Sequence, residues 1–171
     1  EVLLVGSRAY AAKFGVQVPH VGVAKHNHGN FKEITLPTYK IEPDIFAWIR
    51  DRLKEAWLWM DTIGVDMQLN SGNVPGAVTV VWQKGALPNV NRIGGEVITM
   101  DDNTPRWLEV TQIVMRHELG HVLGFPDCYT EFYDTSLKAM TYYVLDADDG
   151  MCALSGLMRE RHRDALLRGY F

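Results

Sequence analysis

The chain has 171 residues, of which 47% are hydrophobic and 22% charged, and its formal net charge is −4 at pH 7. This length suits one domain with a hydrophobic core and is too short for two ordinary domains. The acidic balance argues against nucleic acid as a partner, and no apolar run approaches the roughly 18 residues of a membrane-spanning helix. We therefore expect a single globular domain, residues 1–171, that is a monomer and contacts neither nucleic acid nor membrane.

Residues 1–33 carry the weakest pattern in the chain. Residues 7–14 could form a short helix, and residues 15–24 alternate apolar and polar side chains imperfectly. Residues 26–30 have the composition of a turn-rich loop. The two histidines of this loop could bind a metal, but a solvated loop is the simpler interpretation.

A strand and a long helix come next. Residues 34–41 have strand character, and Pro37 in their middle indicates an edge or bent strand, because proline cannot donate to a ladder. Pro43 suits the first turn of a helix. Apolar side chains then recur at the helical period as far as Met60, and Gly64 is the predicted end. We interpret this helix as a core packing element.

The middle of the chain predicts a sheet. Strands are expected at residues 65–69, 77–83 and 96–100, and the β-rich second of these suits the interior of a sheet. Residues 84–95 contain proline, asparagines and a glycine pair, so we expect a loop with at most a short strand. Together with the helices on either side, these strands predict an α+β fold.

A second long helix follows the last of these strands. Pro105 suits its first turn, and Asn103 or Thr104 is the expected N-cap. The helix is predicted to run through Trp107 to Leu123.

The sequence HELGHVLGFPD, which begins in this helix, organises the chain. His117 and His121 are four residues apart, so they project from one helix face and can meet one metal ion. Glu118 can address a metal-bound water without ligating the metal. Gly124 tolerates the left-handed conformation that turns the chain sharply. This turn can bring Asp127 back as the third ligand.

Two histidines and one carboxylate leave a fourth position on zinc for water, which is the arrangement of a catalytic site. Zinc lowers the pKa of such a water toward ~7, and Glu118 would take its proton and return it to a leaving amine. Two alternatives remain. The motif could be accidental in an amphipathic helix, or Glu160 could replace Asp127 as ligand, although Gly124 would then have no role.

The C-terminal third is expected to be mostly irregular before a last helix. Residues 129–137 show no regular pattern. Residues 146–150 are acidic enough for calcium but miss the EF-hand spacing, so a solvated acidic loop is the simpler interpretation. A helix is predicted from Ser155 to Gly169, with His162 as a packing or surface residue.

The motif HExxHxxGxxD, followed by a methionine at Met140, resembles the metzincin signature of zinc endopeptidases. Asp127 as third ligand is similar to the snapalysin group of small secreted bacterial metalloproteases. The resemblance is specific over residues 94–143 and extends in outline from about residue 34 to the C-terminus. It implies a twisted, mostly parallel small sheet with an antiparallel edge strand and two long helices, the second carrying the zinc motif. It also implies an upper subdomain of about 1–124 and a lower one of about 125–171 with a Met-turn and the last helix.

The resemblance also implies roles around the zinc. Met140 would lie under the ion as an apolar support, with an ordinary core methionine as the alternative. Tyr142 matches the tyrosine that astacins and serralysins place near the metal, where it could donate a hydrogen bond to the oxyanion, and a structural role is the alternative.

The substrate implied by the resemblance is an extended polypeptide paired with an edge strand within residues 84–95, near Gly94 and Gly95. Tyr143 and Val144, after the expected Met-turn, would line the pocket that selects the substrate.

The two cysteines, Cys128 and Cys152, could be buried thiols or a disulfide. A bridge would connect the segment after Asp127 to the segment before the last helix and contribute roughly 2–4 kcal/mol. Snapalysin-like enzymes carry a cysteine pair around the Met-turn, so the resemblance favours the bridge and a secreted bacterial protein.

Two other functions share the same ligands. A non-catalytic zinc-binding or peptide-binding module would use the histidines but would not need Glu118 beside His117. A toxin or effector protease of narrow specificity would keep the chemistry and change the substrate.

Overall fold

The computed structural model describes residues 8–171, and all structural statements concern this part of the chain. The order of elements is β1-β2-α2-β3-β4-β5-β6-β7-α3-β8-β9-α4, after a helical turn at 8–12. The helices are α2 (Pro43–Ala56), α3 (Glu109–Val122) and α4 (Glu160–Tyr170). The strands are β1 (Ala24–His28), β2 (Phe31–Tyr39), β3 (Leu58–Trp59), β4 (Ile63–Asn70), β5 (Thr79–Gln83), β6 (Asn89–Val90), β7 (Val97–Asp101), β8 (Tyr129–Asp134) and β9 (Ala139–Val144).

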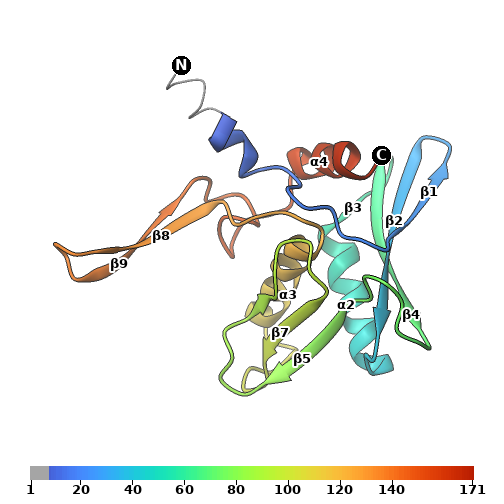
Figure 1. Ribbon diagram of the computed structural model, residues 1–171, viewed down its shortest axis with the longest axis horizontal. Helices are drawn as coiled ribbons and strands as arrows, with labels where there is room; N and C mark the ends of the chain where they lie inside the picture. The colour runs from blue at the N-terminus through green and yellow to red at the C-terminus, as the bar shows by residue number, and fades with distance from the viewer. Residues whose placement is uncertain (1–7) are drawn as a thin grey trace.

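The fold is mixed α+β, as the sequence predicted (Figure 1). Its sheets combine parallel and antiparallel strands, so the expectation of a mostly parallel sheet was wrong. The first sheet has the order β1-β2-β4-β3, in which β2 and β4 are parallel and the outer strands antiparallel. The second has the order β5-β7-β6, with β5 parallel to β7 and β6 antiparallel at the edge. A parallel bridge between Thr38 and Val78 connects the two. Helix α2 supplies the crossover that parallel pairing of β2 with β4 requires.

Pro37 indicated an edge or bent strand, and the edge alternative is wrong because β2 is internal to its sheet. Its ladder to β1 ends at Thr35, and beyond it the oxygen of Pro37 accepts the backbone N–H of Val78 at 2.8 Å. The N–H that proline lacks therefore falls where β2 changes partner from β1 to Val78. That position needs no ladder donor, which is why proline is tolerated inside the sheet.

The predicted loop at 26–30 is largely a hairpin. His26 and His28 belong to β1, where they pair with Glu33 and Phe31, and only the connection at Gly29, with φ 65°, is a turn. The partner strand β2 was needed to reveal β1, because the local composition favours a turn.

Helix α2 ends at Ala56 and not at the predicted Gly64. Trp57 is fully buried, and its carbonyl oxygen accepts the N–H of Val65 at 3.0 Å, so the chain already enters the sheet at this residue. Met60, expected on the helix, is 81% exposed. Tertiary pairing with β4 has overridden the helical period here.

Helix α3 begins at Glu109, four residues later than Pro105 suggested. The Thr111 hydroxyl donates to the carbonyl oxygen of Pro105 at 2.9 Å, and the Gln112 amide donates to that of Trp107 at 3.1 Å. Pro105 therefore starts a capping loop, and the first helical turn follows it.

The core lies where α2, α3 and α4 meet the sheets. The Trp57 ring is 5.3 Å from that of Phe125 and 5.8 Å from that of His162. This cluster attaches the chain after α3 and the last helix to α2. His162 was expected to be a packing or a surface residue, and the structure shows that it packs in the core. Helix α4 starts at Glu160 and not near Ser155.

Residues 129–137 are not irregular. They form β8 and its turn, and β8 pairs with β9 as a two-stranded hairpin. Figure 1 shows this hairpin, in orange, extending away from the helices and the other sheets. Among residues 8–171, no helix has the length and apolar character needed to cross a bilayer.

Candidate metal centre

Helix α3 and the turn after it bring the three predicted ligands together. The Nε2 atoms of His117 and His121 are 3.1 Å apart, and the Asp127 Oδ1 lies 3.1 Å from the first and 3.3 Å from the second. Four zinc ligands at bond lengths of about 2.0–2.1 Å stand roughly 3.3 Å apart in a tetrahedron. The three atoms therefore fit one face of a zinc coordination sphere and leave a fourth position open.

The other ring nitrogens fix the tautomers of both histidines. The His117 Nδ1 donates to the carbonyl oxygen of Gly150, and the His121 Nδ1 donates to that of Phe125, both at 2.8 Å. A carbonyl oxygen can only accept, so each neutral ring presents its Nε2 lone pair to the centre. Two lone pairs and the Asp127 carboxylate repel one another unless a cation lies between them. Metal-binding histidines usually donate their other ring N–H to a carbonyl or carboxylate oxygen, as both histidines do here.

The electrostatics of these groups favour positive charge. Burial would raise the pKa of Asp127, but when the rings of His117 and His121 carry a proton on Nε2 as well, they donate to the carboxylate, outweigh the effect of burial and hold that pKa well below its usual range. Burial would lower the pKa of His121, but the hydrogen bond and charge of Asp127 raise it overall. The site therefore stabilises a cation more than an isolated carboxylate would.

Gly124 makes the turn that returns Asp127, as predicted. Its φ is 95°, and a β-carbon there would collide with the carbonyl oxygen of Val18. The Gly124 oxygen accepts the N–H of Gln17 at 2.8 Å, so the N-terminal segment covers the turn. Only glycine combines this backbone conformation with such a close approach.

Glu118 is buried beside the ligands, with 4% of its surface exposed. Its Oε2 has no hydrogen-bond partner among the described residues. Burial raises the pKa of this carboxyl, and the charges of His121 and His117 oppose the rise only partly. It lines a pocket of about 260 Å³ together with His117 and Tyr129. A buried carboxylate oxygen without a partner at a pocket wall is a candidate proton acceptor.

The predicted Met-turn at Met140 is wrong. Met140 lies on β9, opposite Tyr133, and is 52% exposed. The methionine that supports the motif helix is Met151, which is 1% exposed and whose sulfur packs against Gly120. It sits in a tight turn closed by the N–H of Cys152 and the oxygen of Asp149 at 3.0 Å.

Tyr142 is not brought against the metal ligands. It lies on β9 opposite Glu131 and is 58% exposed. The tyrosine next to the ligands is Tyr129, which sequence reasoning missed although it lies two residues after Asp127. Burial and the charge of Asp127 raise the pKa of Tyr129 to about 12, so its hydroxyl remains a donor at neutral pH.

The predicted substrate residues lie in two places, on the β8–β9 hairpin and near the end of α3. Tyr143 stacks on Phe132 with ring centroids 5.5 Å apart, and Val144 lies opposite Tyr129 on the hairpin. Gly94 and Gly95 are both buried.

The glycine pair supports the end of α3. The Gly94 N–H donates to the carbonyl oxygen of His121 at 2.8 Å, and a β-carbon on Gly94 would collide with the Val18 oxygen. The segment 84–95 does contain an edge strand, but that strand is β6, Asn89–Val90.

The disulfide is confirmed. Cys128 and Cys152 are bonded, with their Cα atoms 4.5 Å apart. The bridge joins the residue after Asp127 to the residue after Met151. It therefore fixes both the third ligand and the turn that carries the Gly150 oxygen. A disulfide is consistent with an extracellular protein.

The acidic segment 146–150 is not a solvated loop throughout. Asp149 is fully buried, where it pairs with Arg161 and lies 3.2 Å from the His162 Nε2. Asp146 pairs with the same arginine at 2.7 Å. These two carboxylates are already neutralised, so the structure gives no support to calcium there.

The alternative third ligand is not at the centre. The Glu160 carboxylate is 82% exposed and lies 3.6 Å from the Arg163 guanidinium. Asp127 is the carboxylate that meets the histidines.

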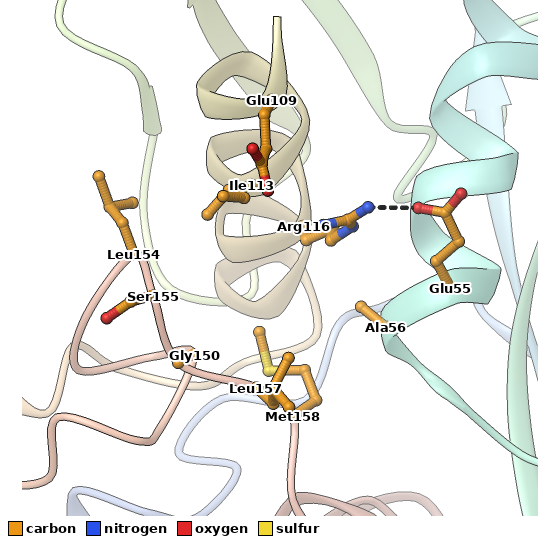
Figure 2. A pocket seen from close by; sticks show the side chains of 11 residues that line it. Glu55, Ala56, Glu109, Ile113, Arg116, Gly150, Leu154, Ser155, Leu157 and Met158 are labelled. Carbon is orange, nitrogen blue, oxygen red and sulfur yellow. Dashed lines mark hydrogen bonds and ion pairs between the residues drawn. The ribbon is translucent and has the colours of Figure 1, made fainter.

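A cavity of about 780 Å³, larger than the pocket beside Glu118, is not the metal centre (Figure 2). Its walls are Glu109, Ile113 and Arg116 of α3, the end of α2 and residues 154–158. Leu154 also lines the smaller pocket beside His117, so the two hollows adjoin. Cavity volume therefore does not identify the candidate metal centre, whereas the arrangement of His117, His121 and Asp127 does.

No protein-family model matches the chain, and no curated protein or solved structure shows significant similarity to it. Assignment to a family therefore depends on the motif and on the geometry of the centre.

Proposed function

We propose that this chain is a secreted zinc-dependent endopeptidase of the metzincin type, resembling the snapalysin group. The observation that carries the proposal is the triangle of His117, His121 and Asp127 with a buried, unpartnered Glu118 oxygen beside it. A zinc-binding module alone would need the triangle but would gain nothing from a buried carboxylate without a partner, because such a group is costly.

His117, His121 and Asp127 would hold the zinc, which supplies a Lewis acid and lowers the pKa of a water molecule. Glu118 would accept a proton from a water molecule at the centre and return it to the nitrogen of the leaving group. Its raised pKa suits this exchange, since a carboxylate of ordinary pKa holds a proton too weakly at neutral pH.

Tyr129 and β6 position the substrate. The Tyr129 hydroxyl stays protonated and can donate a hydrogen bond to the carbonyl oxygen of the scissile bond as it becomes negative. Strand β6 is antiparallel at the edge of its sheet, so an extended peptide can pair with its free side. The pocket of about 260 Å³ between Pro88, His117 and Leu154 then receives a substrate side chain.

The test is hydrolysis of a fluorescence-quenched denatured protein, with bound zinc measured in the same samples. Glu118→Gln is expected to retain one zinc per chain and to lose about 10²–10⁴-fold in turnover. Glu109→Gln, on the exposed start of the same helix, is the matched control and should be unaffected. His117→Ala should lose zinc and activity together.

If Glu118→Gln retains most of its turnover, the proposed role of this residue is wrong. A wild-type protein that binds zinc but cleaves nothing would point instead to a binding module or an effector of narrow specificity.

A further inference from the structure

The β8–β9 hairpin begins two residues after Asp127 and extends away from the body of the protein (Figure 1). In the described chain it forms a sheet of only two strands, so both of its outer edges are free. Its large apolar side chains are exposed: Phe132, Tyr133, Met140, Tyr142, Tyr143 and Val144. An isolated hairpin gains little from burial, and clustered exposed apolar side chains mark interaction surfaces.

The register divides these side chains between two faces. Cross-strand partners point to the same side, and successive residues alternate. Tyr129 with Val144, Glu131 with Tyr142, and Tyr133 with Met140 form one side, which we name the Tyr129 face. On the opposite face, Phe132 and Tyr143 stack on each other beside polar residues.

The Tyr129 face is continuous with the metal centre. Tyr129 lines the pocket that also contains His117 and Glu118. From there the face runs outward to the Tyr133–Met140 pair, four residues further along β8. At the rise of an extended strand, this distance is roughly 13 Å.

We propose that the Tyr129 face binds the substrate polypeptide beyond the scissile bond and selects segments with apolar or aromatic side chains. The inference rests on the proposed function, because an extended peptide that leaves the pocket at Tyr129 continues over this face. An extended substrate has the same rise per residue as β8, so side chains about four positions from the pocket meet Tyr133 and Met140.

Binding is measured first, with turnover blocked. The zinc-bound Glu118→Gln protein is titrated against fluorescently labelled, denatured casein. Adding Tyr133→Ser and Met140→Ser should raise the Kd about tenfold or more, since a few aromatic and apolar contacts supply most of the binding free energy at such surfaces. Phe132→Ser is the matched control on the opposite face and should change the Kd by less than about twofold.

Kinetics with two quenched peptides follow, in the active protein. One peptide ends two residues from the scissile bond on each side, and the other extends six residues on each side. Tyr133→Ser with Met140→Ser should lower kcat/KM for the long peptide about tenfold through KM and leave the short peptide unchanged. An unchanged short peptide also shows that the variant is folded and holds its zinc.

Three results overturn the inference: unchanged casein binding, equal losses for both peptides, or an equal effect of Phe132→Ser. Concentration-dependent dimers that only the Tyr133→Ser/Met140→Ser variant loses, with casein binding intact, would assign the face to a second copy of the chain. Failure of the proposed function gives a different result from failure of this inference. If the protein is not a peptidase, wild type cleaves neither peptide, and the casein titration still shows whether the Tyr129 face binds polypeptide.

Discussion

Removing the Cys128–Cys152 bridge tests whether covalent structure holds the metal centre together. The perturbation is the double variant Cys128→Ala/Cys152→Ala. The bridge closes a loop with a sequence separation of 24 residues. For a loop of this size, the loop-closure entropy corresponds to about 3.5 kcal/mol at room temperature. We expect the free energy of unfolding to fall by about this amount.

The assay is urea unfolding followed by the fluorescence of the five tryptophans, with zinc removed by a chelator so that metal binding does not contribute. Wild-type protein in reductant is the control and should reproduce the double variant. A loss below about 1 kcal/mol with an unchanged m-value would refute the loop-closure argument.

The same variant should weaken zinc binding. Asp127 directly precedes Cys128, and Gly150, which accepts the Nδ1 proton of His117, lies two residues before Cys152. Loss of such an outer-shell support usually costs about 10–100-fold in metal affinity. A zinc affinity equal to that of wild type would show that the bridge stabilises the fold without positioning the ligands.

The remaining predictions concern packing, charge and backbone. Met151→Ala should lower the free energy of unfolding in urea by about 2–5 kcal/mol, because Met151 is buried. Met140→Ala, on the exposed hairpin, should change it by less than about 0.5 kcal/mol. The reverse order would show that Met140 is the methionine that supports the motif helix. Asp149→Asn should cost roughly 3–5 kcal/mol at neutral pH. Burial would raise the pKa of Asp149, but its histidine, backbone and arginine partners hold that pKa below its usual value. The contribution of Asp149 to the free energy of unfolding is therefore fully present above about pH 4 and is lost as pH falls through the lowered pKa. The difference from wild type should therefore narrow in acid, and a constant difference would contradict this assignment. Gly124→Ala should cost about 1–3 kcal/mol by thermal unfolding, because its φ is positive and a carbonyl oxygen faces it, whereas the control Gly72→Ala, in open space, should be nearly neutral.

The sequence determined what depends on local spacing. His117 and His121 share a helix face because they are one turn apart, and Gly124 turns the chain because glycine alone accepts the backbone conformation there. The α+β class and the cysteine bridge also followed from the residues or from the resemblance that they carry.

Only the tertiary structure decided which distant segments meet these residues. Met151 and not Met140 packs under the motif helix, because the intervening chain is taken up by a hairpin whose pairing no local pattern announced. The same hairpin places Tyr129 rather than Tyr142 beside Asp127. Such contacts join residues far apart along the chain, and their outcome depends on the path of the connecting segment, which the period of a helix or strand does not encode.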